Sequence, residues 1–163
     1  MNDTFEVRLA GPDDESTLAA LRRAWTEEIA GGRVDDPEFE GRFGEWFARE
    51  SDQRVTWLGS KDGEPAGMVN ALIFTRMPKP GTQPSRWFYL ANFYVLPDHR
   101  NGGLGSRMLT ALTDYADQHE FVRTVLSPSD RSVPFYERSG FREAYDLMIR
   151  PQPTGRTQRR HSG

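Results

Sequence analysis

The fold is decided by the stretch Val95-Leu96-Pro97-Asp98-His99-Arg100-Asn101-Gly102-Gly103-Leu104-Gly105. An apolar run over 87–95 precedes the glycines, and residues 104–118 carry apolar side chains at helical spacing. The pattern predicts a strand, a tight glycine-rich turn and a helix. The first backbone N–H groups of a helix lack intrahelical partners and lie at the positive end of its dipole, so this turn suits a phosphate group.

Two familiar nucleotide motifs do not match this turn. A P-loop ends in Gly-Lys-Ser/Thr, whereas Gly105 is followed by Ser106 and Arg107. A dinucleotide fingerprint reads G-x-G-x-x-G, whereas the spacing in this chain is Arg-x-x-Gly-x-Gly. An ordinary glycine-rich turn without a ligand stays open as the alternative.

A second motif follows further along the chain, and it reads Ser132-Val133-Pro134-Phe135-Tyr136-Glu137-Arg138-Ser139-Gly140-Phe141. With the Arg-x-x-Gly-x-Gly turn behind Val-x-Pro, it resembles the GNAT family of N-acetyltransferases. The first motif is similar to the acyl-CoA pyrophosphate loop of that family, and the second to its Phe-Tyr-x-x-x-Gly-Phe motif. The resemblance covers residues 88–149 well, and over 5–75 it covers only the order of elements.

The pattern of the whole chain predicts one α/β domain over residues 1–150. Strands are expected at 5–9, 55–59, 67–75, 87–95, 121–126 and 141–150. Two helices are expected between the first two strands, one at 104–118 and a short one at 134–139. This order fits a mixed, mostly antiparallel sheet of six or seven strands with helices on both faces, and the resemblance implies the acyl-CoA N-acyltransferase fold. Residues 151–163 are expected to be a disordered, arginine-rich tail.

Composition narrows the function classes. The 163 residues include no cysteine, which excludes disulfides and a thiolate nucleophile. The net charge of −3 argues against nucleic-acid binding, for which the arginines of the tail are the only support. Neither a long apolar run nor a leader-like N-terminus is present, so a cytoplasmic protein without a membrane partner is expected. Three scattered histidines predict that no metal is bound.

The resemblance implies a site for acetyl-CoA as co-substrate. Its pyrophosphate would bind the turn, and one further contact would come from the position where many relatives carry an asparagine. In this chain that position is a serine. The expected contacts with acetyl-CoA are Val95, Arg100, Asn101, Gly102, Gly103, Leu104, Gly105, Ser106 and Ser129.

Acetyl transfer to an amine needs a neutral nucleophile, a stabilised oxyanion and a proton for the leaving thiolate. By resemblance, Tyr136 is the general acid, although a purely structural role as a core aromatic is compatible with that. The N–H of Val95 is expected to bind the oxyanion, and Asn92 to orient a water or the substrate. Strand 87–95 contains no acid, so Glu27 or Glu28 acting through water is the open alternative for a base, and solvated surface is the simpler interpretation of both.

The function predicted is acetyl transfer from acetyl-CoA to a primary amine by direct attack in a ternary complex. The alternative is a catalytically silent domain that binds or senses acyl-CoA. Residues 11–52 hold twelve acids against five arginines, which favours a cationic small molecule over a peptide as the amine, and a protein N-terminus or a lysine stays open as the alternative. The resemblance places the substrate pocket at 30–37 and 77–86, and it makes a homodimer one expectation.

Overall fold

The computed structural model describes residues 4–153. The chain divides into two compact units, Met1–Leu126 and Ser127–Gly163. The single domain predicted over 1–150 stays a prediction, and most of the predicted tail, 151–163, lies outside the described residues. Within 4–153 no helix is long and apolar enough to cross a membrane.

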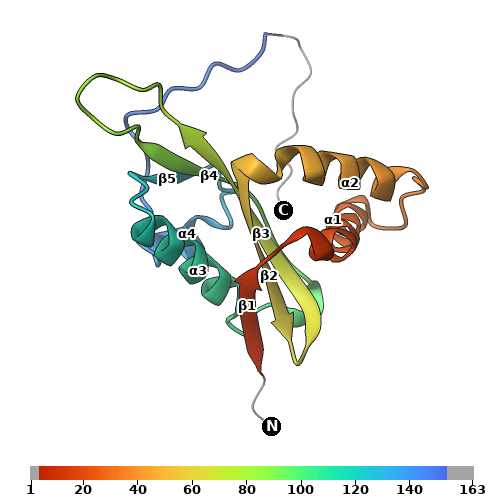
Figure 1. Cartoon of the computed structure of the whole chain (residues 1–163). Coiled ribbons are helices and arrows are strands. Elements are labelled where there is room, and N and C mark those ends of the chain that lie inside the picture. The colour runs from red at the N-terminus through yellow and green to blue at the C-terminus, as the bar shows by residue number, and fades with distance from the viewer. Residues whose placement is uncertain (1–3, 154–163) are drawn as a thin grey trace. The chain divides into compact units, whose positions relative to one another are not determined.

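The first unit contains a five-stranded sheet in the order β1-β2-β3-β4-β5 (Figure 1). The first four strands are antiparallel neighbours, and β5 is parallel to β4. A tight turn at Asp62 and Gly63, both with positive φ, joins β2 to β3 and fixes their register. The strands are β1 (Phe5–Leu9), β2 (Arg54–Lys61), β3 (Glu64–Thr75), β4 (Arg86–Val95) and β5 (Thr124–Leu126).

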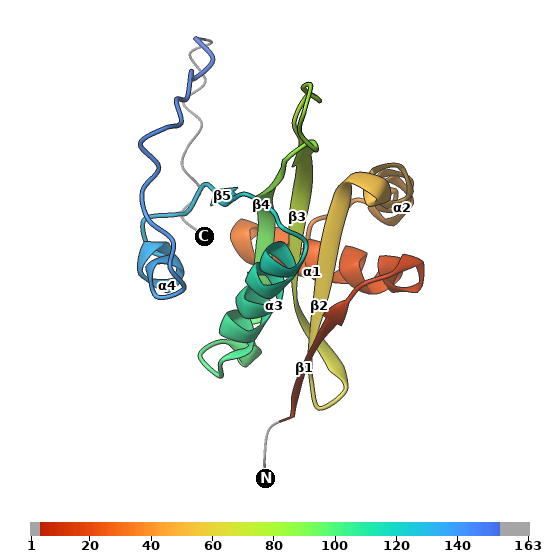
Figure 2. The same ribbon diagram turned by 60° about the vertical axis from the view of Figure 1, so that its left-hand side comes forward.

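Helices cover both faces of this sheet (Figure 2). On one face lie α1 (Glu15–Ala30) and α2 (Phe39–Glu50). Leu18 and Leu21 of α1 are buried with three sheet side chains, Leu58, Met68 and Tyr94. The prediction of a mixed, mostly antiparallel sheet with helices on both faces is confirmed.

The opposite face carries α3 (Leu104–Gln118), whose bounds match the prediction from the sequence. Its Tyr115 contacts the rings of Trp57 and Phe88, which point to this face. Closer to its start, α3 approaches the sheet at a glycine. A Cβ on Gly59 would lie 2.9 Å from Met108 Sδ, so the missing side chain lets the helix pack directly on the strand. This contact fixes the start of α3, where the glycine-rich turn ends.

The second unit contains one short helix, α4 (Val133–Glu137), among its described residues. Gly140 follows it at φ 89°, as expected for a glycine that ends a helix. The strand predicted at 141–150 is absent, so the described residues contain five strands and not six or seven. Residues 141–149 include several apolar side chains, as a strand would. A strand also needs a neighbour for its backbone groups, and the described part of Ser127–Gly163 contains none.

Candidate active site

The outer edge of β4 is paired with another strand over only part of its length. The strand pairs with β3 from Arg86 to Val95, but with β5 only from Phe88 to Leu90. The Leu96 N–H donates to the Ala66 carbonyl at 2.8 Å. Because bonded and non-bonded pairs alternate in an antiparallel ladder, the N–H and C=O of Val95 face away from β3. The end of β4 therefore presents the backbone groups of Val95 on its outer side, immediately before the glycine-rich turn.

The glycine-rich turn begins with a 3₁₀ turn, Pro97–His99, and ends at Gly103, the residue before α3. Asn101 and Gly103 have positive φ values of 64° and 96°. No side chain caps α3, and the first amide that bonds within the helix is that of Arg107, to the Gly103 carbonyl at 3.1 Å. The amides of the three residues between them, 104–106, thus lie at the positive end of the helix without an intrahelical acceptor.

Gly102 and Arg100 stabilise the turn through two different contacts. A Cβ on Gly102 would lie 3.0 Å from the ring of Phe5, so this glycine allows β1 to pack against the turn. The Arg100 N–H donates to the Pro97 carbonyl at 3.3 Å and is used within the turn. The amide groups of the predicted cradle that precede α3 are therefore held in place by local packing and hydrogen bonding.

The Arg100 side chain points to α1. Its Nε donates to the Val95 carbonyl at 3.0 Å, and its Nη2 donates to Glu28 Oε2 at 2.8 Å. The Tyr94 hydroxyl donates to the same carboxylate oxygen at 2.8 Å, and Trp25 stacks on the Tyr94 ring. This contact ties the last turn of α1 to the end of β4. Sequence reasoning missed it because 72 residues separate Glu28 from Arg100 and no pattern links them.

Glu28 was one of the two alternatives for a general base. The hydrogen bond from Arg100 lowers its pKa, with a smaller contribution from the bond donated by Tyr94. A carboxylate that is held as an ion pair accepts a proton poorly near neutral pH. Glu27, the other alternative, accepts the Val34 N–H at 3.2 Å in the connection between α1 and α2. Both side chains thus have structural partners.

Asn92 lies in a row of polar residues that crosses the sheet. A β-bulge at Ala91 shifts the register of β4, so that Asn92 pairs with Asn70, which pairs in turn with Thr56. Asn70 is buried, and its Nδ2 donates to Thr56 Oγ1 at 2.6 Å. The row lies on the α1/α2 face, since the neighbouring row contains the buried Leu58. An asparagine within the apolar run of β3 was the visible signal that the sequence analysis did not use.

The acidic excess of 11–52 is partly neutralised by ion pairs within the first unit. Six of the twelve acids form ion pairs with arginines, and three of those arginines lie outside the segment. A surface of paired charges attracts a cation less than the composition suggests. The paired acids are Asp14, Glu27, Glu28, Asp36, Glu40 and Glu50.

The second unit holds the other predicted residues, Tyr136 and Ser129. Tyr136 lies in α4 and is buried, with ring contacts to Phe135 and Phe141. Burial raises the pKa of its phenol to about 12. Ser129 bonds through its hydroxyl to that of Ser132 at 3.1 Å, in the turn that starts the helix. The structure thus groups Asn92, Val95 and residues 100–106 in the first unit, and Ser129 and Tyr136 in the second.

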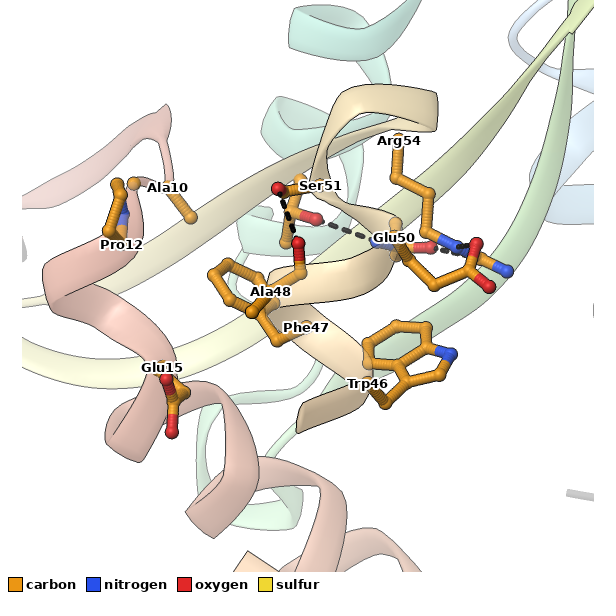
Figure 3. A pocket seen from close by; sticks show the side chains of 12 residues that line it. Ala10, Pro12, Glu15, Trp46, Phe47, Ala48, Glu50, Ser51 and Arg54 are labelled. Carbon is orange, nitrogen blue, oxygen red and sulfur yellow. Dashed lines mark hydrogen bonds and ion pairs between the residues drawn. The ribbon is translucent and has the colours of Figure 1, made fainter. Parts of the chain in front are cut away.

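A cavity of about 460 Å³ lies beneath α2 in the first unit (Figure 3). Trp46 and Phe47 form its aromatic wall, and Thr56 and Asn70 belong to its lining. Arg54 and Glu50 lie together at one end, whereas Glu15 lies at the other. Residues 30–37 and 77–86, where the resemblance placed the substrate, do not line this cavity. No group of three or more potential metal ligands occurs in the described part of the chain.

Comparison with known proteins establishes the family. The model of the acetyltransferase (GNAT) family matches residues 17–141. The chain therefore belongs to the acetyltransferase (GNAT) family, which confirms the class of acyl-CoA-dependent N-acetyltransferases predicted from its two motifs.

Individual relatives are more distant. Over 88 residues the chain is 26% identical to a glucosamine 6-phosphate N-acetyltransferase of Trypanosoma brucei brucei. The matched stretch covers 54% of this chain and 57% of that protein. A predicted acetyltransferase from Clostridium acetobutylicum, crystallised with acetyl-CoA, has a TM-score of 0.71 at 19% identity, covering 91% of this chain and 96% of that one. The structure of glucosamine-6-phosphate N-acetyltransferase from Arabidopsis thaliana has a TM-score of 0.67 at 18% identity, and the match covers 91% of this chain and 98% of that one. These two structures support the fold.

Proposed function

We propose that this protein transfers an acetyl group from acetyl-CoA to a primary amine by direct attack in a ternary complex. The observation that carries the proposal is the glycine-rich turn, which begins beside the outward-facing backbone of Val95 and ends in the uncapped amides at the start of α3. Membership of the GNAT family supports the same conclusion. A ternary complex needs no covalent intermediate, which agrees with a chain that contains no cysteine.

The turn fits the pyrophosphate of acetyl-CoA. Gly103 has open space on its Cβ side and a φ that L-residues avoid, so the backbone is both accessible and fixed. The amides of Leu104, Gly105 and Ser106 would donate to the phosphate oxygens, with Asn101 and Gly102 shaping the approach. Arg100 contributes mainly by holding the Val95 carbonyl through its Nε. Ser129 is proposed as a further polar contact to the CoA arm.

Three residues would act on the reacting atoms. The Val95 N–H, which faces away from β3, would donate to the oxyanion that forms when the amine attacks. Asn92 would orient the attacking amine or a water beside it. Tyr136 would donate a proton to the departing thiolate, and a phenol with a pKa of about 12 stays protonated at neutral pH, as this role requires. β4 carries no acid that could accept the proton of the amine. The amine must therefore lose this proton before it attacks, or release it to solvent water.

The acceptor in this proposal is a small amine and not a polycation that negative surface charge would attract. The ion pairs of the 11–52 segment support this choice, because they hold six of its twelve acids and so weaken the attraction of that surface for a polycation. Both the Trypanosoma and the Arabidopsis relatives act on glucosamine 6-phosphate according to their names, which makes an amino sugar a sensible first acceptor to assay.

The second candidate is a silent acyl-CoA-binding domain. It is favoured by the absence of an acid on β4 and by the ion pair that occupies Glu28. Replacing Tyr136 with phenylalanine separates the two candidates. An enzyme should lose about a hundredfold in kcat while its Kd for acetyl-CoA stays within twofold, because only the proton donor is removed.

Tyr145→Phe is the matched control, because it removes an exposed hydroxyl in the same unit. Thiol release from acetyl-CoA with an amine panel is the kinetic assay, and calorimetry gives the Kd. Unchanged kcat in Tyr136→Phe would refute the general-acid role, and no thiol release with any amine, despite acetyl-CoA binding, would favour the silent domain.

A further inference from the structure

The floor of the cavity beneath α2 is polar where a sheet face is normally apolar. Asn70 is 6% exposed and Thr56 is 9% exposed, and both lie in the centre of the sheet. Arg54 Nη1 donates to Asn70 Oδ1 at 2.8 Å, and Asn70 Nδ2 donates to Thr56 Oγ1. These bonds use the Asn70 oxygen as acceptor and leave its second Nδ2 hydrogen and the Thr56 hydroxyl hydrogen for another acceptor. The floor is therefore rich in donors.

Arg54 is the charged residue of this floor, and its positive charge has only a long contact with a carboxylate. Its side chain is 18% exposed, and its guanidinium stacks on Trp46 at 4.9 Å from the ring centroid. Its contact with Glu50 is 3.4 Å long, whereas Arg23–Glu40 and Arg100–Glu28 approach to 2.7 and 2.8 Å. Within residues 4–153 Arg54 has no shorter contact with a carboxylate. A guanidinium that is mostly buried and weakly paired favours binding of an additional anion.

The position of the cavity connects it with the proposed reaction. Asn70 is the ladder partner of Asn92, and neighbouring strands lie about 4.8 Å apart, so the floor begins one strand away from the residue proposed to orient the amine. Glu15 also lines the cavity, but at the end remote from Arg54 (Figure 3). A volume of about 460 Å³ is enough for a small organic group.

We infer that this cavity binds the part of the acceptor remote from its amine, and that this part carries an anionic oxygen group, a carboxylate or a phosphate. Arg54 is the charged ligand, and Asn70 and Thr56 supply neutral donors beside it. Trp46 holds the guanidinium plane from the other side. The acceptor is therefore an amine that bears an acid group, and the inference rests on the proposed acetyl transfer for the identity of the reacting end.

The first experiment measures anion binding without turnover. Inorganic phosphate or acetate is titrated into the full chain, with chloride at matched ionic strength as reference, and the arginine Nε–H NMR signals are followed. The Arg54 signal is identified by its loss in Arg54→Lys. We expect that signal to shift saturably with phosphate or acetate, because the guanidinium fork binds both oxygens. No saturable shift, or an equal shift with chloride, would overturn the inference.

The second experiment measures selectivity during acetylation. Matched amines are compared by kcat/KM, phosphoethanolamine with ethanolamine and γ-aminobutyrate with butylamine, so the phosphate and carboxylate sources are tested separately. The wild-type protein should favour the anionic member of at least one pair by about tenfold to a hundredfold, as expected for a charge-assisted contact. Arg54→Gln should bring that ratio close to one, mainly through a higher KM. Arg49→Gln, an exposed arginine of α2 outside the cavity, is the matched control and should keep the ratio.

The outcomes separate this inference from the proposed function. Acetylation of neutral amines with no preference for anionic ones, or a preference that survives Arg54→Gln, would overturn the inference and leave acetyl transfer standing. Absence of acetyl-CoA binding would overturn the proposed function and the acceptor assignment together, even with a saturable Arg54 response. Acetyl-CoA binding by Arg54→Gln checks that a lost ratio does not come from unfolding.

Discussion

Replacing Gly103 with alanine tests the role of the glycine-rich turn with little steric complication. Gly103 has φ 96° and ψ −1°, and no atom lies within 4 Å of the position that a Cβ would take. The cost of the substitution is therefore backbone strain alone, about 1–2 kcal/mol for an L-residue in the left-handed region. For a protein of 163 residues this corresponds to a fall in Tm of roughly 2–8 °C.

The same strain should also reduce binding. Relaxing φ at Gly103 turns the peptide that leads into α3, so the amides of residues 104–106 leave their common direction. We expect the Kd for acetyl-CoA to rise at least about tenfold, because oriented amides are the proposed ligands of the pyrophosphate. Isothermal titration calorimetry measures the Kd, and thermal unfolding measures the stability of the same samples.

Gly63→Ala is the matched control for this experiment. Gly63 has φ 83° in the turn between β2 and β3, and it also has open space on its Cβ side. It should therefore lose similar stability without any change in acetyl-CoA affinity. If Gly103→Ala loses the same stability as the control and still binds acetyl-CoA within twofold of the wild type, the amides of residues 104–106 are not the ligands of the pyrophosphate.

Three further predictions follow from buried and paired groups. Gly67→Ala should lower the free energy of unfolding more than Gly59→Ala does in chemical denaturation. A Cβ on Gly67 would lie 2.7 Å from the backbone oxygen of Tyr94, whereas a Cβ on Gly59 would meet side-chain ends that can move. Equal losses in the two variants would contradict this prediction. The phenols of Tyr94 and Tyr136 have folded-state pKa values of about 12 against about 10 when unfolded, so their contribution to stability is complete below pH 10 and is lost between pH 10 and 12. Denaturation curves at pH 9 and 11 should show this loss, and a double phenylalanine variant should reduce it. Glu28→Gln should keep at least about a tenth of kcat/KM with an unchanged acidic limb of the pH profile, since that carboxylate is held by an arginine; loss of the limb would identify Glu28 as the base after all.

The elements that the sequence predicted well have local causes. Helix 104–118 follows from apolar spacing after a glycine, and β1 from alternation, and both have the expected bounds. The glycine-rich turn was predicted for the same reason, because its glycines and the helix that follows are adjacent in the chain. Segment 141–150 also contains several apolar residues but is not a strand, since composition says nothing of whether a neighbouring strand is present.

The site features that the sequence did not predict depend on register and on distant contacts. A bulge of one residue in β4 decides that Asn92 faces Asn70, and a single shift would turn it to the other face. The contact of Arg100 with Glu28 joins the glycine-rich turn to the last turn of α1 across 72 residues. Arg54 directly precedes the strand predicted at 55–59, and only the fold brings it beside Asn70 and Trp46.

The most direct measurement is a calorimetric titration of the full chain with acetyl-CoA, with ATP and NAD as comparison ligands. We expect micromolar binding of acetyl-CoA and much weaker binding of the other two, because the turn has neither the P-loop nor the dinucleotide motif. No binding of acetyl-CoA at millimolar concentration would contradict the central claim, and the glycine-rich turn would then be a structural feature only.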